Sequence, residues 1–414
     1  MSALAHVGPL VASSVWLDSP IDLLTVAGPY GWLWERDRVG LAGRGVALRI
    51  TAPDLALAGG VVGSALADIP SDDTVGVPGS GPIAVAALPF HRSARVSLVV
   101  PEITVGRTDS GRCWLTTVGT PGPADAQALI ARLAAAPAQD PDGFDLTSPI
   151  PHEQWMDLVA LAVKDIDAGL FDKVVLAREV LVKANRAIHI PTVLRRLRSL
   201  YPACTVISDG AFVAASPELL ISRRGDQVRS HPLAGTIPRS GEPEADAALA
   251  AALLASPKDR AEHGWVVRDV SSTLAPWCAS LDVPATPSIV SLRNVSHLGT
   301  EITATLTPGL GPSALALAAA LHPTAAVGGT PRDAALAWLA AHERLDRGPY
   351  AGPVGWVDSR GDGEWAVGIR SAVIHGSTAR LFAGVGVVEG SDPASELAET
   401  QFKLQALLAA VVRP

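Results

Sequence analysis

The stretch that decides the fold runs from residue 348 to residue 404 and reads GPYAGPVGWVDSRGDGEWAVGIRSAVIHGSTARLFAGVGVVEGSDPASELAETQFKL. Apolar-rich runs at 354–358, 364–374 and 381–388 are separated by the turn-forming segments SRGDG and HGSTA. Apolar runs broken by Gly- and Ser-rich turns predict three antiparallel strands. This end of the chain therefore supplies neighbouring strands of a sheet.

A helix follows these strands. Asp392 is placed to cap it, and Pro393 suits its first position. Glu396, Glu399 and Lys403 then fall at i, i+3 and i+7, which puts them on one helix face. Two carboxylates and an ammonium beside glycine-rich strands indicate a site for a small, anionic, metal-bound ligand. A solvated charged face is the alternative interpretation.

Bulk composition limits the class of protein. The 414 residues are 48% hydrophobic, which is enough for one large domain or two, and the net charge of −8 argues against a nucleic-acid surface. Cys113, Cys204 and Cys278 show no C-x-x-C spacing, which favours a reducing compartment. No basic secretory start or continuous apolar stretch of about 18 residues is visible. We expect a cytoplasmic protein without membrane or nucleic-acid partners.

Lysine is rare in this chain. Of the 33 basic residues only five are lysine: Lys164, Lys173, Lys183, Lys258 and Lys403. Such a lysine is either chance or a position where an always-charged guanidinium cannot act, as for a base that must lose its proton. Lys173 and Lys403 are the candidates.

The chain divides near residue 150. Residues 1 to about 145 read as short strands punctuated by Gly and Pro, and 137–153 read as a linker. We therefore expect a variable, β-rich N-terminal part at 1–150 and a catalytic region at 151–414.

Helix signals recur after this division. Apolar residues at helical spacing predict a helix at 155–166, followed by a strand that starts at Lys173. Ser256 and Thr330, each followed by Pro, are expected to start further helices. The whole pattern predicts an α+β protein with a large antiparallel β-sheet core, flanking helices, and a site between sheet and helices.

Several motifs occur in a fixed order: KVVLAR, SPELL, HPLAGT, SPKDRAEH, LHPTAAVGGTP, GPYAGPVGW, GIRSA, AGVGVVEGSDPASELAET and QFKL. In this order they resemble the chorismate-utilising enzymes, which include isochorismate, salicylate, anthranilate and aminodeoxychorismate synthases. The resemblance covers roughly residues 150–414 and implies the chorismate-binding fold.

Three features indicate the isochorismate synthase branch within that resemblance. Lys173 occupies the place of the lysine that activates water, where the anthranilate branch usually carries Gln. Ala234 stands where aminodeoxychorismate synthases typically carry a lysine nucleophile. Ala326 and Val327 replace the Thr-Ala pair that salicylate synthases tend to have, which is a weaker signal.

The resemblance also implies roles. Lys173 would take a proton from water, and Glu218 would protonate the departing hydroxyl, so Glu218 must hold its proton near neutral pH. Glu262 and Glu399 would bind Mg²⁺, with Glu396 close by and able to act through water.

A substrate-binding set follows from the same resemblance. Arg370 would grip the enolpyruvyl carboxylate with its two-pronged donor, and Lys403 would complete the carboxylate pocket. The full set is Gly235, His297, Ala326, Tyr350, Arg370, Gly384 and Lys403.

Alternatives remain at this point. Salicylate synthase is the second choice, and it differs by the release of pyruvate. A silent chorismate-fold binder is a third possibility, and a two-carboxylate glycoside hydrolase is a fourth. A monomer is expected, with an oligomer left open, and the product could serve menaquinone or siderophore synthesis.

Overall fold

The computed structural model describes residues 10–119, 139–309 and 311–412, together with 122, 125, 126, 128 and 130. The first nine residues and the first two residues of the predicted linker lie outside these described residues.

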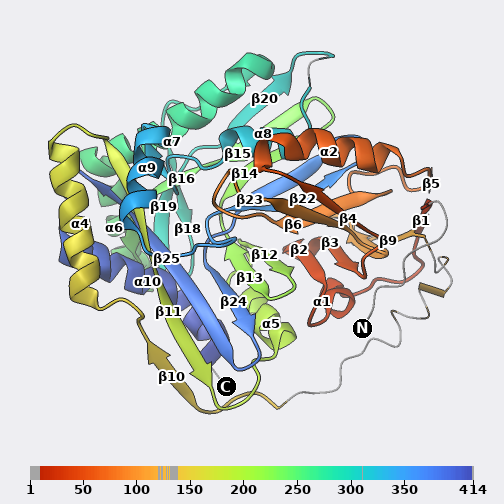
Figure 1. Cartoon of the computed structure of the whole chain (residues 1–414), viewed down its shortest axis with the longest axis horizontal. Coiled ribbons are helices and arrows are strands. Elements are labelled where there is room, and N and C mark those ends of the chain that lie inside the picture. The colour runs from red at the N-terminus through yellow and green to blue at the C-terminus, as the bar shows by residue number, and fades with distance from the viewer. Residues whose placement is uncertain are drawn as a thin grey trace.

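The larger sheet contains 13 strands among the described residues (Figure 1). All neighbours in it are antiparallel except β1 and β5. Its order is β10 (Phe144–Thr147), β11 (Lys173–Ala184), β25 (Thr378–Val388), β24 (Ser371–His375), β13 (Phe212–Ser216), β12 (Thr205–Asp209), β2 (Trp32–Arg36), β3 (Val39–Arg44), β8 (Ile103–Arg107), β9 (Cys113–Val118), β1 (Ala12–Trp16) and β5 (Ser71–Asp73), with β21 (Gly329–Thr330) beside β11.

A second sheet of nine strands and a small sheet of three complete the β structure of the described part. The nine-stranded order is β17 (Cys278–Asp282), β20 (Ile302–Leu306), β15 (Gln227–His231), β14 (Leu219–Arg224), β23 (Gly363–Val367), β22 (Pro353–Asp358), β6 (Ile83–Ala87), β7 (Val96–Val100) and β4 (Leu48–Ala52). The small sheet is β16 (Leu233–Pro238), β19 (Val295–Gly299) and β18 (Ser288–Ser291). The predicted α+β class with a large antiparallel core is confirmed.

Both large sheets combine strands from before and after residue 150. β2 pairs with β12, and β6 pairs with β22. The division near residue 150 is thus not a boundary between separate sheets, and it stays a prediction from the sequence.

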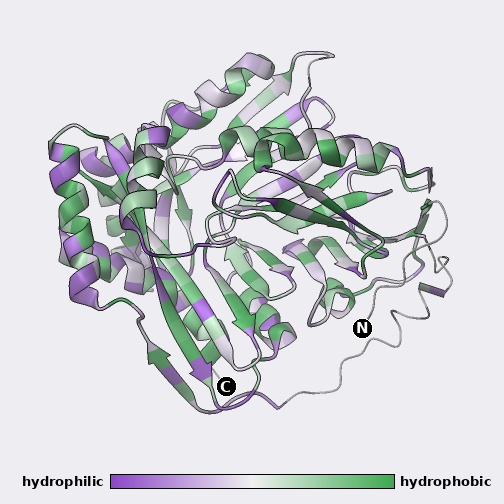
Figure 2. Ribbon diagram, in the orientation of Figure 1, coloured by the Kyte–Doolittle hydropathy of each residue, from purple (hydrophilic) through white to green (hydrophobic). Residues whose placement is uncertain are grey.

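An aromatic core lies between the two large sheets. Trp34 and Trp114 come from the larger sheet and Trp356 from the second, and all three are buried in one cluster with Ile207 and Ile83. Figure 2 shows the strands around this region coloured mainly as hydrophobic. Large aromatic side chains bury much apolar surface, so this cluster holds the two sheets together.

Helices cover the outer faces of the sheets (Figure 1). α2 (Leu55–Ala67) packs on α8 (Ala314–Leu321) over the second sheet, and α4 (His152–Asp167) packs with α10 (Pro393–Val412) against β11 and β25. The other described helices are α1 (Leu23–Ala27), α5 (Ile190–Leu200), α6 (Pro243–Ala255), α7 (Pro257–Leu274), the 3₁₀ turn Ala275–Trp277 and α9 (Arg332–His342). Among the described residues no helix is both long enough and apolar enough to cross a membrane.

Helix starts agree with the sequence prediction in two of three places. Ser256 accepts a hydrogen bond from the Asp259 amide at 3.2 Å, and Asp392 accepts one from the Ser395 amide at 2.8 Å. The prediction for Thr330 is wrong in detail, because α9 begins at Arg332 without a side-chain cap.

The description of the N-terminal part as strands also missed one long helix. α2 contains adjacent glycines, which weaken the helical signal of its sequence. Asp54 nevertheless caps it by accepting a hydrogen bond from the Leu57 amide at 3.0 Å.

The predicted single strand at 364–374 is wrong. β23 ends at Val367 in the second sheet, and β24 begins at Ser371 in the larger one. The chain changes sheets through Arg370, whose φ is +51°. Between β13 and β14 it changes sheets again, through Glu218. The Val367 amide donates to the Glu218 carbonyl at 3.2 Å, so the two crossings lie side by side.

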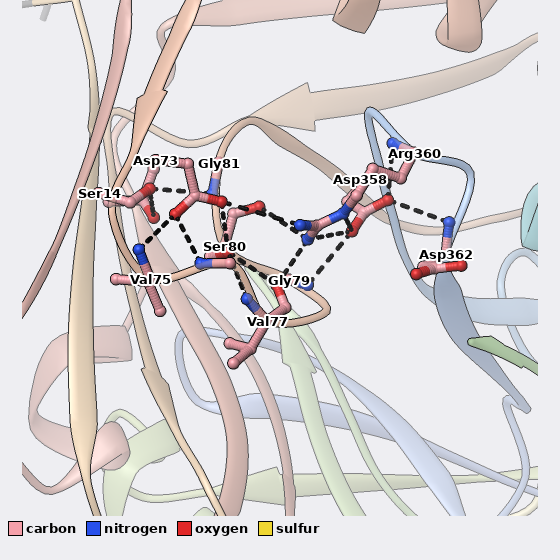
Figure 3. Close-up of polar contacts among 12 residues, drawn as sticks. Ser14, Asp73, Val75, Val77, Gly79, Ser80, Gly81, Asp358, Arg360 and Asp362 are labelled. Carbon is pink, nitrogen blue, oxygen red and sulfur yellow. Dashed lines mark hydrogen bonds and ion pairs between the residues drawn. The ribbon is translucent and has the colours of Figure 1, made fainter. Parts of the chain in front are cut away.

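A polar network joins the N-terminal part to the β22–β23 turn (Figure 3). Arg360 donates to the Asp358 carboxylate at 2.8 Å and to the carbonyls of Val77 and Ser80 at 2.5 and 3.3 Å. One arginine thus ties two distant segments together.

Candidate functional site

One cavity, with about 900 Å³ of empty space, opens where the sheet crossings meet α7 and α10. The cavity is lined by every predicted site residue except Lys173: Glu218, Gly235, Glu262, His297, Ala326, Tyr350, Arg370, Gly384, Glu396, Glu399 and Lys403. Residues nearly 200 positions apart therefore share one site.

Lys173 lies behind Glu262 at the start of β11. Its side chain is 1% exposed, and its Nζ is 2.8 Å from Oε1 of Glu262. Gly386 leaves room for this pair, because a Cβ at that position would lie 2.5 Å from Glu262 Oε1 and 2.7 Å from Lys173 Cε. Glycine at position 386 is thus required by the packing of two charged side chains.

The charge of Glu262 is favoured by its neighbours. Burial alone would raise its pKa, but the Lys173 ammonium, with help from Lys403 and Lys258, outweighs burial and lowers it. Glu262 is therefore an anion facing the cavity.

Glu218 behaves in the opposite way. Glu218 is only 4% exposed, and burial raises the pKa of its carboxyl to about 8. A hydrogen bond with the Leu233 backbone and the charges of Lys173 and Lys403 act against this shift without cancelling it. A carboxyl of this kind keeps its proton at neutral pH and can donate it.

His297 and Arg370 form a buried contact. Arg370 Nη2 donates to His297 Nε2 at 3.0 Å, and His297 Nδ1 lies 3.2 Å from the Gly235 carbonyl. Burial, with the Arg370 charge, holds the pKa of His297 well below its usual value. A neutral ring with its proton on Nδ1 satisfies both contacts, because Nε2 accepts and Nδ1 donates.

Arg370 keeps a free donor in this arrangement. Its Nη1 is buried without a hydrogen-bond partner in the described part of the chain. Since the guanidinium lines the cavity, an anionic ligand could satisfy it. Nearby, Tyr350 stacks on Phe382 with ring centroids 5.1 Å apart, and burial raises the pKa of Tyr350, so its hydroxyl stays protonated.

The α10 residues lie on one face, as predicted. Lys403 Nζ is 2.6 Å from Glu399 Oε1 and donates to the Gly384 carbonyl at 2.9 Å. Glu396 lies 3.7 Å from Lys258 Nζ. Burial and then the negative charge of Glu399 raise the pKa of Glu396 to about 7. The crowded carboxylates repel one another.

This donor set suits a hard cation. As the side chains stand, no group of three His, Cys, Asp or Glu side chains within the described ranges converges as a metal site. Each of the three predicted ligands instead faces a lysine: Glu262 with Lys173, Glu396 with Lys258, and Glu399 with Lys403. Carboxylate oxygens that attract ammonium groups and raise one another's pKa are the donors that Mg²⁺ prefers.

Sequence reasoning missed three polar residues of the cavity. The Thr236 hydroxyl lies 3.1 Å from His297 Nδ1, and Asp259 of α7 lines the cavity. Lys258, beside Glu396, was counted among the rare lysines but not selected. Its rarity was a signal that could have identified it.

The similarity to known proteins covers the whole region that forms this cavity. A family model described as chorismate binding enzyme matches residues 58–412. A salicylate biosynthesis isochorismate synthase of Pseudomonas aeruginosa is 38% identical over 334 residues, covering 80% of this chain and 63% of that protein. The isochorismate synthase DhbC of Bacillus subtilis is 41% identical over 276 residues, covering 64% of this chain and 69% of that protein.

A solved structure shows the same architecture. The menaquinone-specific isochorismate synthase MenF of Escherichia coli superposes with a TM-score of 0.81 at 26% identity, covering 98% of this chain and 95% of that one. The similarity therefore extends over the N-terminal part, for which the motifs gave no resemblance.

Proposed function

Because this chain belongs to the chorismate-binding enzymes, we propose that it is an isochorismate synthase, an isomerase that interconverts chorismate and isochorismate. One observation carries the proposal. Glu218, a carboxyl that keeps its proton, lines a single cavity, and the buried Lys173 lies behind Glu262 in the wall of the same cavity. An exchange of hydroxyl groups needs one proton acceptor and one proton donor.

The reaction balances without a redox partner. Water adds at C2 of the ring while the C4 hydroxyl leaves as water, and the ring double bonds shift between them. Lys173 leaves the ion pair with Glu262 and releases its ammonium proton to solvent, and the neutral amine then takes a proton from the entering water. Glu218 gives its proton to the departing hydroxyl. The same two groups serve the reverse reaction with their roles exchanged.

The substrate's two carboxylates have separate partners in this proposal. The unpartnered Nη1 of Arg370 takes the enolpyruvyl carboxylate, and the neutral His297 holds the guanidinium in place from behind. Lys403 lines the same cavity beside Glu399 and is available to the ring carboxylate. The buried hydroxyl of Tyr350 can donate to the same ligand.

Magnesium is part of the proposal. Glu262, Glu396 and Glu399 would hold it, and when bound it would offset the charge of the ring carboxylate, which a chain of net charge −8 does not do by itself. The lysine partners of these carboxylates would then be free to contact substrate. A cytoplasmic site of action is also proposed, in keeping with three cysteines that are all free.

The test is incubation of the purified protein with chorismate, with and without Mg²⁺, followed by proton NMR, salicylate fluorescence and a pyruvate assay. A magnesium-dependent mixture of chorismate and isochorismate without pyruvate is expected. Salicylate with equimolar pyruvate would instead establish the salicylate synthase alternative, and unchanged chorismate would leave a binding protein.

A further inference from the structure

A buried arginine outside the cavity connects two of its walls. Arg347 is 1% exposed and donates from Nη1 to the Val327 carbonyl at 3.0 Å and from Nη2 to the Val175 carbonyl at 2.7 Å. Val175 and Val327 both line the cavity, although they lie about 150 positions apart in the chain. A single planar guanidinium therefore bridges two wall segments.

The arginine is itself held in place. Glu343, four residues earlier, accepts from Arg347 Nε at 2.6 Å and from Nη2 at 2.9 Å. The same carboxylate accepts the Ala177 amide of β11 at 2.9 Å. Phe90 lies under the guanidinium, with its ring centroid 4.2 Å from Cζ. Every nitrogen of this side chain is thus satisfied, and Arg347 does not line the cavity.

The wall at Ala326 has a second anchor on its other side. Asp269 of α7 accepts the Ala325 amide at 2.9 Å and pairs with Arg332 at 3.1 Å. Ala326, which faces the cavity, therefore lies between one backbone group held by Asp269 and one held by Arg347. This segment has no helix or strand of its own from His322 to Gly328. Its end is joined to β11 by the Val175 amide, which donates to the Gly328 carbonyl at 2.9 Å, and Asp269 and Arg347 hold the residues on either side of Ala326.

Burial of a charged pair is a poor way to gain stability, because the desolvation cost offsets the attraction. The Arg347–Glu343 pair instead supplies a fixed geometry at the cavity wall. From these contacts we propose that Arg347, held by Glu343, is a positioning residue that fixes the Ala326 side of this segment against strand β11, which carries Lys173. This inference rests on the proposed function for its chemical readout.

The chain offers a matched control. Arg360 also binds one carboxylate and two backbone carbonyls of a distant segment, and Figure 3 shows these bonds. None of its partners lines the cavity. It is more exposed than Arg347, at 41% of its side chain against 2%. Lysine at either position can keep the charge but cannot hold both carbonyls.

The experiment compares Arg347→Lys with Arg360→Lys by thermal unfolding, by kcat/KM for chorismate, and by amide hydrogen exchange. We expect Arg347→Lys to lower kcat/KM by about tenfold to a hundredfold, as small misplacements in a site do. Exchange should rise in peptides that cover 174–177 and 324–328. Arg360→Lys should keep the wild-type kcat/KM. A folded Arg347→Lys protein with wild-type kcat/KM, or an equal loss in Arg360→Lys, overturns the proposal.

Two further measurements keep the outcome clear. If Arg347→Lys does not fold, Glu343→Gln takes its place, and wild-type kcat/KM in that variant overturns the proposal equally. If the wild-type protein does not convert chorismate, the proposed function fails by itself. The calorimetric Kd for chorismate is then compared, and the positioning role requires a weaker Kd in Arg347→Lys than in Arg360→Lys.

Discussion

Lys173 Nζ lies 2.8 Å from Glu262 Oε1, so the proposed base forms an ion pair with a proposed metal ligand. The lysine side chain is almost completely buried, and the carboxylate is the part of the pair that faces the cavity. The two roles are therefore coupled, because Glu262 must change partners before Lys173 can accept a proton from water.

Lys173→Met should abolish turnover by removing the base, a loss of roughly a hundredfold to ten-thousandfold in kcat. It should also destabilise the protein by about 3–5 kcal/mol, because Glu262 is left as an unpaired buried charge. The double variant Lys173→Met/Glu262→Gln should recover much of the stability and none of the activity. Denaturant unfolding and the NMR assay measure the two effects, and a single variant as stable as the wild type contradicts the ion-pair argument.

Glu218 should produce a pH dependence with a definite sign. Its pKa rises from the usual 4.5 to about 8 on folding, so the folded state binds the proton more tightly than the unfolded state. The stability contribution is full below the unfolded value and is lost as pH rises through the folded value. Stability should therefore decline between pH 4.5 and about 8 from this group, and activity should fall above about 8.

Glu218→Gln checks both statements. The variant should lose roughly a hundredfold to ten-thousandfold in kcat and should lack that part of the pH slope in thermal unfolding scans. An unchanged slope would show that Glu218 does not titrate in this pH range.

Removal of Mg²⁺ with a chelator should stop turnover, and replacement should restore it. Because a ligand that binds only the folded state stabilises it, Mg²⁺ should also raise the Tm of the wild-type protein. Glu399→Gln should reduce both effects. Asp142→Asn, at an exposed carboxylate outside the cavity, is the control. An equal Tm increase in Glu399→Gln and wild type would remove Glu399 from the metal site.

Arg370→Lys should raise KM for chorismate by about tenfold to a hundredfold, because a point charge replaces the two-pronged donor. The kcat at saturating chorismate should change less. Steady-state kinetics by product NMR or absorbance separate the two constants. A fall in kcat alone, with KM unchanged, would mean that the guanidinium does not bind the ground-state carboxylate.

Gly384→Ala should lower kcat/KM, since a Cβ there would lie 2.7 Å from the Tyr350 hydroxyl and 3.1 Å from the Leu176 carbonyl. The hydroxyl of Tyr350, which lines the cavity, would have to move. Gly60→Ala is the matched control in α2, where a Cβ meets nothing within 4 Å. That variant should gain about 0.5–1 kcal/mol in unfolding free energy and keep wild-type activity. Equal activity in both variants would contradict the close approach at Gly384.

The sequence by itself determined the local elements and the charged face of α10. Helix caps such as Ser256 and Asp392, the start of β11 at Lys173, and the α10 face with Glu396, Glu399 and Lys403 all follow from short-range patterns. Such patterns depend on neighbours within about one or two helical turns, which is why they could be read without the fold.

Only the tertiary structure decided where the chain changes sheets and which charges meet. The run at 364–374 looks like one strand because each half is apolar, yet Arg370 with its φ of +51° carries the chain from one sheet to the other. Nothing local distinguishes that crossing. The pairing of Lys173 with Glu262, and the span of Arg347 between Val175 and Val327, join distant segments. Their burial, and hence the pKa of about 8 at Glu218, arises from packing that no single segment contains.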